Sequence, residues 1–403
     1  MNILFLSTWF PYPLDNGSRI RTFYLSQALA THHELTIVAF NPEARNSDNH
    51  VATQQRTGMR VVPVADDPFR YANLPTLVKY LSPIPVTLWP SRAMEKTVER
   101  LISNSRWDAF VAFQSPVARY ARRVAAPVHI FDLDAALSHT MYQHFKAQTS
   151  PPARIRAWLS WQKAQQREAS LVKGFDICTI ASTHELNHLQ HLIGSTGAKA
   201  VVIPNGVDCA HNHPNHRPKI PGRLVFNGSL AYQANHDAMR FFLSQIYPIM
   251  QATSHELTVT ITGSTKGVTL ASLALDNSVH LTGFVDDVRI PVAEAEVCVV
   301  PLRQGGGTRL KILEAMALGT PVVATSKGAE GLEVAPGKHL LVADDPATFA
   351  RYTLDLLADP ALRDRLAINA RRLVEERYDW QIIGRRFVDL VEGAVERSRK
   401  EQR

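Results

Sequence analysis

The residues best suited to chemistry follow a short apolar strand in the second half of the chain. The segment 301–321 reads PLRQGGGTRLKILEAMALGTP, which is a strand end, three glycines, a helix of about three turns and a new strand. Gly305, Gly306 and Gly307 let the backbone approach a ligand closely, and the amides of the helix's first turn carry partial positive charge. This arrangement predicts an anion site that suits a diphosphate.

Polar side chains add to the same element. Thr308 is expected to cap the turn or donate its hydroxyl, while Arg309 and Lys311 place two cations within one turn of the glycines, where they can replace a metal ion. Glu314 lies in an apolar run and needs a partner if it is buried, and ribose hydroxyls would serve. The alternative is a plain crossover helix in which Glu314 pairs with Lys311 and Gly319 is the C-terminal cap.

The elements that position these residues are short, buried, β-branched strands that alternate with helices. The pattern predicts an α/β fold of two doubly wound, Rossmann-like domains, with ligands beyond the carboxyl ends of the strands and an active site in the cleft between the domains. In the first half the expected strands are 2–7, 35–40, 59–64, 109–114, 128–133, 177–182 and 200–205, and in the second half 223–228, 258–263, 279–284, 297–302, 321–326 and 339–344.

The domain boundary is expected where the pattern is interrupted. The polar, proline-broken segment 209–222 (CAHNHPNHRPKIPG) predicts a linker between a first domain, 1–208, and a second domain, 223–379. A final helix, 380–403, can cross back to the first domain.

Length and composition restrict the class of protein. The 403 residues suffice for two domains, and the three cysteines, Cys178, Cys209 and Cys298, are far apart without CxxC spacing, which disfavours disulfides and zinc. The chain shows no signal-peptide pattern and no stretch of roughly 20 apolar residues, so we expect a cytoplasmic protein. A net charge of +7 favours anionic partners, but no zinc-finger or ribonucleoprotein motif points to nucleic acid.

Four segments together resemble one known family. LEAMALGTPVVAT at 313–325, NILFLSTWFPYPLDNGSRIRTFYLSQALA at 2–30, IPNGVD at 203–208 and RLVFNGSL at 223–230 are similar to the signatures of retaining glycosyltransferase family 4. The resemblance implies the GT-B fold and transfer of a sugar, with retention of anomeric configuration, from a nucleoside diphosphate donor to a glycan or lipid-linked acceptor. It also implies that neither a metal ion nor a cofactor is needed.

The glycine turn departs from the usual pattern of this family. The GGGTRLK variant resembles a subgroup associated with bacterial exopolysaccharide clusters. The family motif has two glutamates separated by seven residues; Glu314 supplies the second, and the first falls on Gly306. The carboxylate that usually contacts the sugar is therefore unassigned.

The resemblance also implies roles for the loop after the first strand. It places Gly17 and Ser18 at the donor, and Asn16 and Arg19 on the acceptor side. Asp15-Asn16-Gly17 is also simply a good turn. A cation at the start of a helix is unfavourable unless an anion is near, and of the basic residues here we prefer Arg19 as the functional one.

Two aspartates end a strand at 132–134. The spacing of Asp132 and Asp134 resembles a metal-binding DxD motif, but the GT-B resemblance argues against a metal, and such carboxylates are as often helix caps or hydrogen-bonding pairs. Asp134 is expected to face the sugar or acceptor as a catalytic residue, with His139 nearby on the acceptor side.

The second domain contributes two further turns by resemblance. Gly228 and Ser229 follow its first strand, where relatives use a downstream arginine and lysine to grip the diphosphate, and the corresponding stretch 232–235 reads YQAN. We hypothesise that Arg309 and Lys311 supply the missing charges.

The ends of two neighbouring strands are expected to hold the base and ribose. The resemblance assigns this role to Gly263, Phe284 and Val285, mainly through backbone groups. Such contacts do not identify the base.

The segment 151–173 is basic and amphipathic, with one acidic residue, Glu168, and interleaved Ile and Trp. It predicts either an interfacial helix that brings the protein to an anionic membrane or an ordinary helix with a solvated basic face. Two other function classes stay open: a GT-B sugar-nucleotide epimerase and a non-catalytic partner subunit of another glycosyltransferase.

Overall fold

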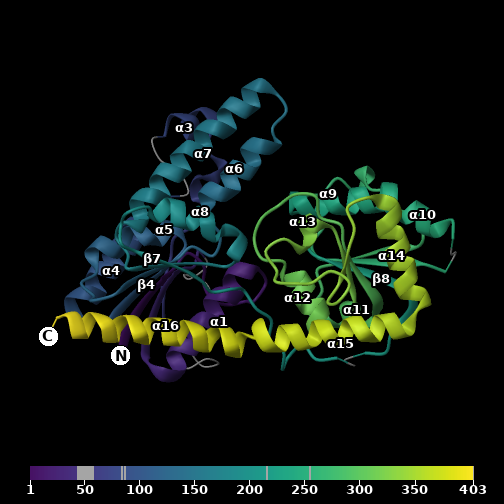
Figure 1. The fold of residues 1–403 in the computed structure, drawn as a ribbon. Coiled ribbons are helices and arrows are strands. Elements are labelled where there is room, and N and C mark those ends of the chain that lie inside the picture. Colours follow the sequence, from purple (N-terminus) through teal and green to yellow (C-terminus); the bar gives the residue numbers. More distant parts are fainter. Residues whose placement is uncertain (43–58, 83–84, 86–87, 215–216, 254–255, 403) are drawn as a thin grey trace. The chain divides into compact units, whose positions relative to one another are not determined.

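The chain folds into two compact units, each built on one parallel sheet (Figure 1). The computed structural model describes all residues except 43–58, 83–84, 86–87, 215–216, 254–255 and 403. The first unit contains Met1–Pro204 together with Ile383–Arg403, and the second contains Asn205–Ile382.

The first unit is organised by a seven-stranded sheet in the order β3-β2-β1-β4-β5-β6-β7. The interior strand β1 is buried from Ile3 to Ser7, and its Phe5 lies beside Ile37 on one side and Val111 on the other. The strands are β1 (Asn2–Ser7), β2 (Glu34–Phe40), β3 (Arg60–Val64), β4 (Ala109–Phe113), β5 (His129–Asp132), β6 (Ile177–Ile180) and β7 (Lys199–Val202).

Helices connect these strands and cover the sheet (Figure 1). The helices are α1 (Gly17–His32), η1 (Arg70–Asn73), α3 (Thr76–Leu81), α4 (Arg92–Asn104), α5 (Ser115–Ala118), η3 (Arg119–Arg123), α6 (Leu137–Ala147), α7 (Pro151–Val172) and α8 (Thr183–Ile193).

The second unit has a six-stranded parallel sheet in the order β10-β9-β8-β11-β12-β13. Val225 pairs with Cys298, which pairs in turn with Val322, and all three are buried. The strands are β8 (Ile220–Asn227), β9 (Thr258–Thr262), β10 (Val279–Gly283), β11 (Ala295–Val300), β12 (Val322–Ala324) and β13 (Leu341–Val342).

The helices of the second unit pack an apolar core against this sheet. They are α9 (Gln233–Phe241), the π-helical turn η4 (Phe242–Ile246), α10 (Tyr247–Gln251), η5 (Leu270–Ser272), α11 (Arg289–Glu294), α12 (Leu310–Ala317), α13 (Ser326–Ala329), α14 (Pro346–Ala358) and α15 (Pro360–Arg377).

The last helix, α16 (Trp380–Glu401), belongs to the first unit from Ile383 onward. Gly384 lets it approach α1 closely, because a Cβ there would lie 2.7 Å from the Cβ of Ala28. Near its end, Arg399 donates to Asp108 Oδ1 at 2.6 Å.

The doubly wound α/β prediction is confirmed, and every expected strand is present with ends shifted by a few residues. The boundary differs, because the chain leaves the first unit after Pro204 and the described part of 209–222 lies in the second unit. Arg371 on α15 donates to the carbonyl oxygens of Cys209 and Asn212. Polar, proline-rich composition suggested a linker, whereas these contacts fix the backbone at Cys209 and Asn212.

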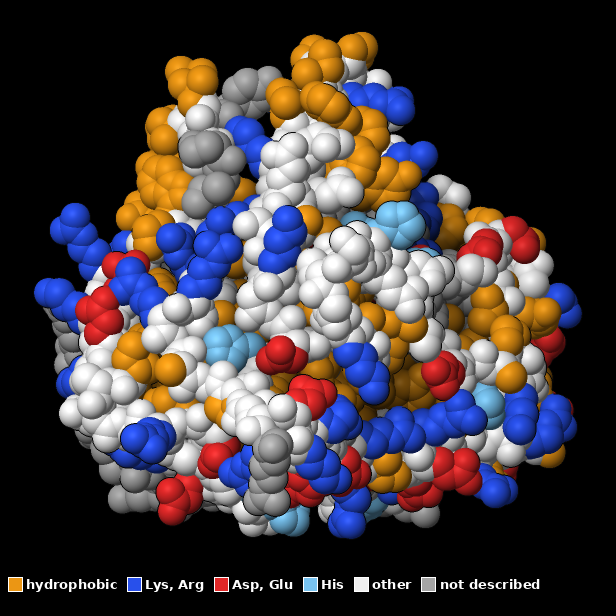
Figure 2. Space-filling model, turned by 60° about the vertical axis from the view of Figure 1, so that its left-hand side comes forward, with side chains coloured by type: hydrophobic (Ala, Val, Ile, Leu, Met, Phe, Trp, Pro, Cys, Tyr) orange, Lys and Arg blue, Asp and Glu red, His pale blue; other side chains and the backbone are white. Residues whose placement is uncertain are grey.

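The helices α6 and α7 form an antiparallel pair in the first unit. The ring of Trp161 lies 4.9 Å from that of Tyr142 and 5.8 Å from that of Phe145, so aromatic contacts join the two helices. Apolar and basic side chains gather on the surface over this part of the unit (Figure 2). In the part of the chain that the structure describes, no helix combines the length and apolar character needed to cross a bilayer.

Candidate active site

Strand order determines where each sheet can hold a ligand. The order reverses between β1 and β4 in the first unit and between β8 and β11 in the second. At such points the loops leave the carboxyl ends of neighbouring strands in opposite directions and open a crevice. Of the residues predicted from the sequence, Asn16, Gly228, Ser229 and 305–309 lie in these loops, and Gly17, Ser18 and Arg19 begin the helix that follows the loop after β1.

The glycine turn of the second unit follows β11. Gly305 adopts a φ of +98°, and a Cβ there would lie 3.0 Å from the Cβ of Ala234 and 3.2 Å from the hydroxyl of Tyr232, so the turn packs closely on α9. The helix α12 begins at Leu310 without a side-chain cap. Thr308 therefore does not cap it as expected, and its Oγ accepts a hydrogen bond from Asn205 Nδ2 at 3.1 Å instead.

Arg309 supports the glycine turn. Its side chain is only 5% exposed, and Nη1 and Nη2 donate to the carbonyl oxygens of Gly306 at 3.0 Å and Gly305 at 2.9 Å. Nη2 also donates to the carbonyl of Lys327 at 3.1 Å. The guanidinium nitrogens of Arg309 were expected to face a ligand. They bond to the protein's own backbone instead and fix the shape of the turn.

The amino group of Lys311 lies at the carboxyl end of β8. Its Nζ donates to Asn235 Oδ1 at 2.8 Å and lies 4.0 Å from the centre of the Phe226 ring. A Cβ added to Gly228 would approach this Nζ to 2.7 Å, which locates the ammonium group beside the turn. Burial lowers the pKa of Lys311 to about 7. Lys311 thus places a cation next to residues 232–235, a stretch that has no basic residue of its own.

Glu314 has a polar partner from a different strand. Its Oε2 accepts a hydrogen bond from Asn227 Nδ2 at 2.8 Å, and burial raises its pKa to about 7, against the opposing effects of Lys311 and Asn227. The alternative prediction was a direct pair between Glu314 and Lys311. In the structure Lys311 donates its hydrogen bond to Asn235 instead. Asn227 was not among the predicted site residues, although a polar residue that ends a buried strand is a recognisable signal.

The turns after β8 and β9 meet in van der Waals contact. Gly263 has a φ of +111°, and a Cβ there would lie 2.6 Å from the amide nitrogen of Ser229 and 2.7 Å from the carbonyl carbon of Gly228. The carbonyl oxygen of Ser229 accepts from Asn235 Nδ2 at 2.8 Å. The path of the Gly228–Ser229 backbone therefore requires glycine at position 263.

Gly263→Ala is expected to lower the stability of the second unit by about 1–3 kcal/mol, because the new methyl group collides with backbone and the residue must hold a positive φ. Thermal unfolding monitored by circular dichroism measures this. Gly267→Ala is the matched control, since Gly267 also has a positive φ, +76°, but no atom within 4 Å of an added Cβ. Equal shifts in the two variants would contradict the close approach.

The residues expected near the base follow the next strand. Gly263 donates its amide to the carbonyl of Gly283 at 2.8 Å, which joins the ends of β9 and β10. Phe284 comes directly after β10 and is 71% exposed, and Val285 is partly buried. An exposed aromatic ring thus lies at the carboxyl edge of this sheet.

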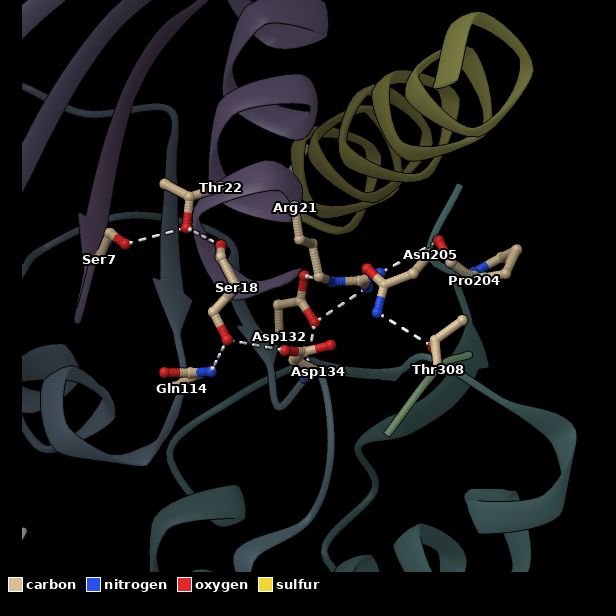
Figure 3. A network of polar contacts seen from close by, with 10 residues as sticks. All are labelled: Ser7, Ser18, Arg21, Thr22, Gln114, Asp132, Asp134, Pro204, Asn205 and Thr308. Carbon is tan, nitrogen blue, oxygen red and sulfur yellow. Dashed lines mark hydrogen bonds and ion pairs between the residues drawn. The ribbon is translucent and has the colours of Figure 1, made fainter. Parts of the chain in front are cut away.

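A polar network joins three loops of the first unit (Figure 3). Ser18 Oγ accepts from Gln114 Nε2 at 2.9 Å and lies 3.3 Å from Asp134 Oδ2, to which it donates. Trp9 Nε1 donates to Gln114 Oε1 at 2.9 Å. Side chains that follow β1, β4 and β5 are brought together here.

Backbone strain marks this network. Gln114, with φ 70° and ψ 159°, and Asp134, with φ 59°, are the non-glycine residues with positive φ in the described ranges. Such conformations cost about 1–3 kcal/mol each and gather at functional sites. Gln114 was not among the predicted site residues, although it directly follows the buried strand β4, much as Asp134 follows β5.

A buried ion pair lies beneath the network. Arg21 Nε and Nη2 donate to the two carboxylate oxygens of Asp132 at 2.9 and 3.1 Å, and both side chains are 0% exposed. Nη1 donates to the carbonyl of Pro204, and Asp132 Oδ1 accepts the amide of Asp134 at 3.0 Å. The first aspartate of the DxD-like segment thus positions the backbone that carries the second.

The other predicted residues of the first loop cap and brace α1. Asn16 accepts the amide of Arg19 at 3.0 Å and caps the helix, which begins at Gly17. Arg19 pairs with Asp15 at 2.9 Å and its guanidinium lies 5.8 Å from the Trp9 ring.

His139 lies in a group of histidines between α6 and α8. Its ring is 5.9 Å from that of His184 and 5.3 Å from that of His188, and its Nε2 lies 2.8 Å from Gln143 Nε2. His139 is thus part of a histidine cluster that joins α6 to α8. Within the described residues, no group of three or more His, Cys, Asp or Glu is arranged to hold a metal ion.

Comparison with known families agrees with this architecture. The family model described as Glycosyltransferase Family 4 matches residues 15–211, and the one described as Glycosyl transferases group 1 matches residues 221–359. The chain belongs to glycosyltransferase family 4. A curated relative of this family 4 chain, glycogen synthase of Mycobacterium tuberculosis, is 26% identical over 405 residues, which cover 95% of this chain and 92% of the relative.

Solved structures identify the fold of this family 4 glycosyltransferase as GT-B. Sucrose-phosphate synthase from Thermosynechococcus elongatus superposes with a TM-score of 0.75 at 17% identity and covers 98% of this chain and 99% of its own. Alr3699/HepE of Anabaena, in complex with UDP and glucose, gives a TM-score of 0.68 at 15% identity and covers 98% and 100%.

Proposed function

We propose that this glycosyltransferase moves a sugar from a nucleoside diphosphate donor to a hydroxyl of a glycan or lipid-linked acceptor, with retention of anomeric configuration. The observation that carries the proposal is the ammonium group of Lys311, held by Asn235 beside Gly228 at the point where the strand order of the second sheet reverses. The UDP and glucose bound by the structural relative from Anabaena support this donor class. Similarity of the GGGTRLK turn favours a role in cell-surface or exopolysaccharide synthesis.

The donor's diphosphate would be held by Lys311 and by the amides of residues 306–308. As the glycosidic bond breaks, negative charge develops on the β-phosphate, and fixed donors in a partly dry site stabilise it without reorganisation. Arg309 keeps the turn in shape through the carbonyls of Gly305 and Gly306. With these charges in place the reaction needs neither a metal ion nor another cofactor.

The nucleoside would extend toward Glu314 and the end of β10. Glu314, with Asn227, offers acceptors and donors to ribose hydroxyls, and the exposed ring of Phe284 offers a surface for stacking on the base. Backbone groups near Gly263 and Val285 complete this part of the proposal.

The Ser18, Gln114 and Asp134 network of the first unit would bind hydroxyl groups of the acceptor. These groups offer both donors and acceptors, which matches the hydroxyls of a carbohydrate. The bond from the anomeric carbon to the β-phosphate breaks, a bond to the acceptor oxygen forms on the same face, and the acceptor's proton passes to the leaving phosphate. This route needs no protein nucleophile, and Asp134 would align the acceptor through hydrogen bonds.

The affinity for a nucleotide sugar is expected to be greatest near pH 7. Lys311 binds the diphosphate when protonated and loses its charge above about pH 7, while Glu314 binds hydroxyls best as a carboxylate and is protonated below about pH 7. The affinity for the donor should therefore fall both below and above pH 7, by up to about tenfold per pH unit. Calorimetry with UDP-glucose, GDP-mannose or ADP-glucose, whichever binds, measures this, because the diphosphate diester does not titrate in this range.

Two variants separate the two limbs of this profile. Glu314→Gln should abolish the acidic fall and keep the alkaline one, and Lys311→Met should do the opposite. A flat profile in the wild-type protein would contradict the assignment of both residues to the donor.

A panel of nucleotide sugars tests the proposed function. A transferase should show a thermal shift with its donor and release nucleoside diphosphate faster when an acceptor glycan is added. Rapid release without any acceptor would indicate an epimerase, and binding without release under either condition would indicate a non-catalytic subunit. NMR of the product's anomeric proton tests retention.

A further inference from the structure

Two helices of the first unit expose apolar side chains. On α3, Leu77 and Leu81 lie one turn apart and are 67% and 71% exposed, and Val78 beside them is also exposed. On the N-terminal end of α7, Ile155 and Trp158 lie three residues apart and are 59% and 44% exposed. Large apolar side chains grouped in this way mark a surface that meets a partner or a membrane.

The sequence around both helices contains no acidic residue. Neither 68–94 nor 135–167 has an Asp or Glu, and the second stretch contains five basic residues: Lys146, Arg154, Arg156, Lys163 and Arg167. Two of these lie over aromatic rings of α6, since Arg154 is 5.2 Å from Phe145 and Lys146 is 5.9 Å from Tyr142. The nearest acid along α7, Glu168, is 0% exposed and accepts hydrogen bonds from Ser115 and Ser138, so it neutralises none of this surface.

Further basic residues lie on η3 and on α7. On η3, Arg119 donates to the carbonyl oxygen of Leu88 at 2.9 Å. Burial, and then the like charges of Arg119 and Arg122, lower the pKa of Arg167 on α7. No carboxylate acts on Arg167 in the described part of the chain, and its buried Nε has no hydrogen-bond partner. A cluster of like charges without a counter-charge is typical of an anion site.

We propose that this face of the first unit, which we call the basic face, docks on an anionic phospholipid bilayer. It comprises the exposed apolar residues of α3 and α7 together with Arg119, Arg122, Arg154, Arg156 and Arg167. The apolar side chains enter the interface, and the guanidinium groups bind lipid phosphates. Figure 2 shows apolar side chains at the top of the molecule with basic side chains below them, over the part where α3, α6 and α7 lie in Figure 1.

Charge complementarity decides in favour of a bilayer over a second copy of this chain. The basic face would repel an identical face, because the described residues give it arginines and no exposed acid, whereas apolar tips above a basic layer match the acyl and headgroup regions of an anionic leaflet. The surface lies within one unit and binds without donor or acceptor, so the inference goes beyond the proposed function and does not depend on it.

Vesicle sedimentation with the full chain tests the inference. Vesicles of phosphatidylcholine with phosphatidylglycerol should bind the protein at low salt, and vesicles of phosphatidylcholine alone should not. Each basic charge removed near the surface should weaken binding by about fivefold, so R119Q/R122Q/R167Q should bind about a hundredfold more weakly. Ile155→Ser with Trp158→Ser should also lose binding, through the apolar part. High salt should release the wild-type protein.

A matched triple variant controls for net charge. R351Q/R365Q/R372Q removes three exposed arginines from the second unit and should bind as the wild type does. Circular dichroism should show unchanged melting for every variant. Absence of binding to the anionic vesicles at low salt, or equal losses in the two triple variants, would overturn the inference. So would a dimer in sedimentation velocity that Trp158→Ser abolishes, since it would assign the surface to a second copy.

Discussion

Lys311→Met is expected to lower kcat/KM by about a hundredfold to a thousandfold with the nucleotide sugar that the protein uses. The ammonium group is fixed by Asn235 and Phe226 before any ligand arrives, so its loss removes preorganised stabilisation of the charge on the leaving phosphate. Steady-state kinetics measures this.

The same substitution should leave the protein folded. Burial lowers the pKa of Lys311, which means that the folded state disfavours its charge, so an apolar side chain of similar length should keep or raise the melting temperature. Lys338→Met, at an exposed position, is the control and should retain full activity. Wild-type kinetics in Lys311→Met would refute the donor site.

Arg21→Met is expected to destabilise the first unit by about 3–5 kcal/mol. The substitution leaves Asp132 buried without a counter-charge, and it also removes the donor to the carbonyl of Pro204. Because the two units need not unfold together, differential scanning calorimetry should be used, and the transition of the first unit should move to lower temperature.

A double variant distinguishes a lost ion pair from a general defect in packing. Arg21→Met with Asp132→Leu removes both charges and should be more stable than Arg21→Met alone, since an apolar pair replaces an unpaired charge. Arg372→Met, which breaks an exposed pair with Glu376, should leave the transitions unchanged. A double variant as unstable as the single one would contradict the role given to the buried charge.

The sequence predicted the fold through local patterns. The buried runs, such as residues 2–7 and 109–114, correspond to strands because an apolar, β-branched segment bounded by turn residues has few other stable arrangements. The glycine turn and the start of α12 were predicted from one continuous segment for the same reason. The contacts at Cys209 and Asn212 could not be predicted in this way, since Arg371, which makes them, is distant in sequence.

What the sequence by itself determined is therefore the two doubly wound units, the glycine turn after β11 and the family to which the chain belongs. Only the tertiary structure decided which side chains contact one another across different elements. Strand order brings Asn235 to Lys311, Asp132 to Arg21 and Gln114 to Ser18, and it brings the carbonyl of Lys327 to Arg309. Spacing along the chain fixes neighbours on one element, whereas contacts between elements depend on how whole sheets pack.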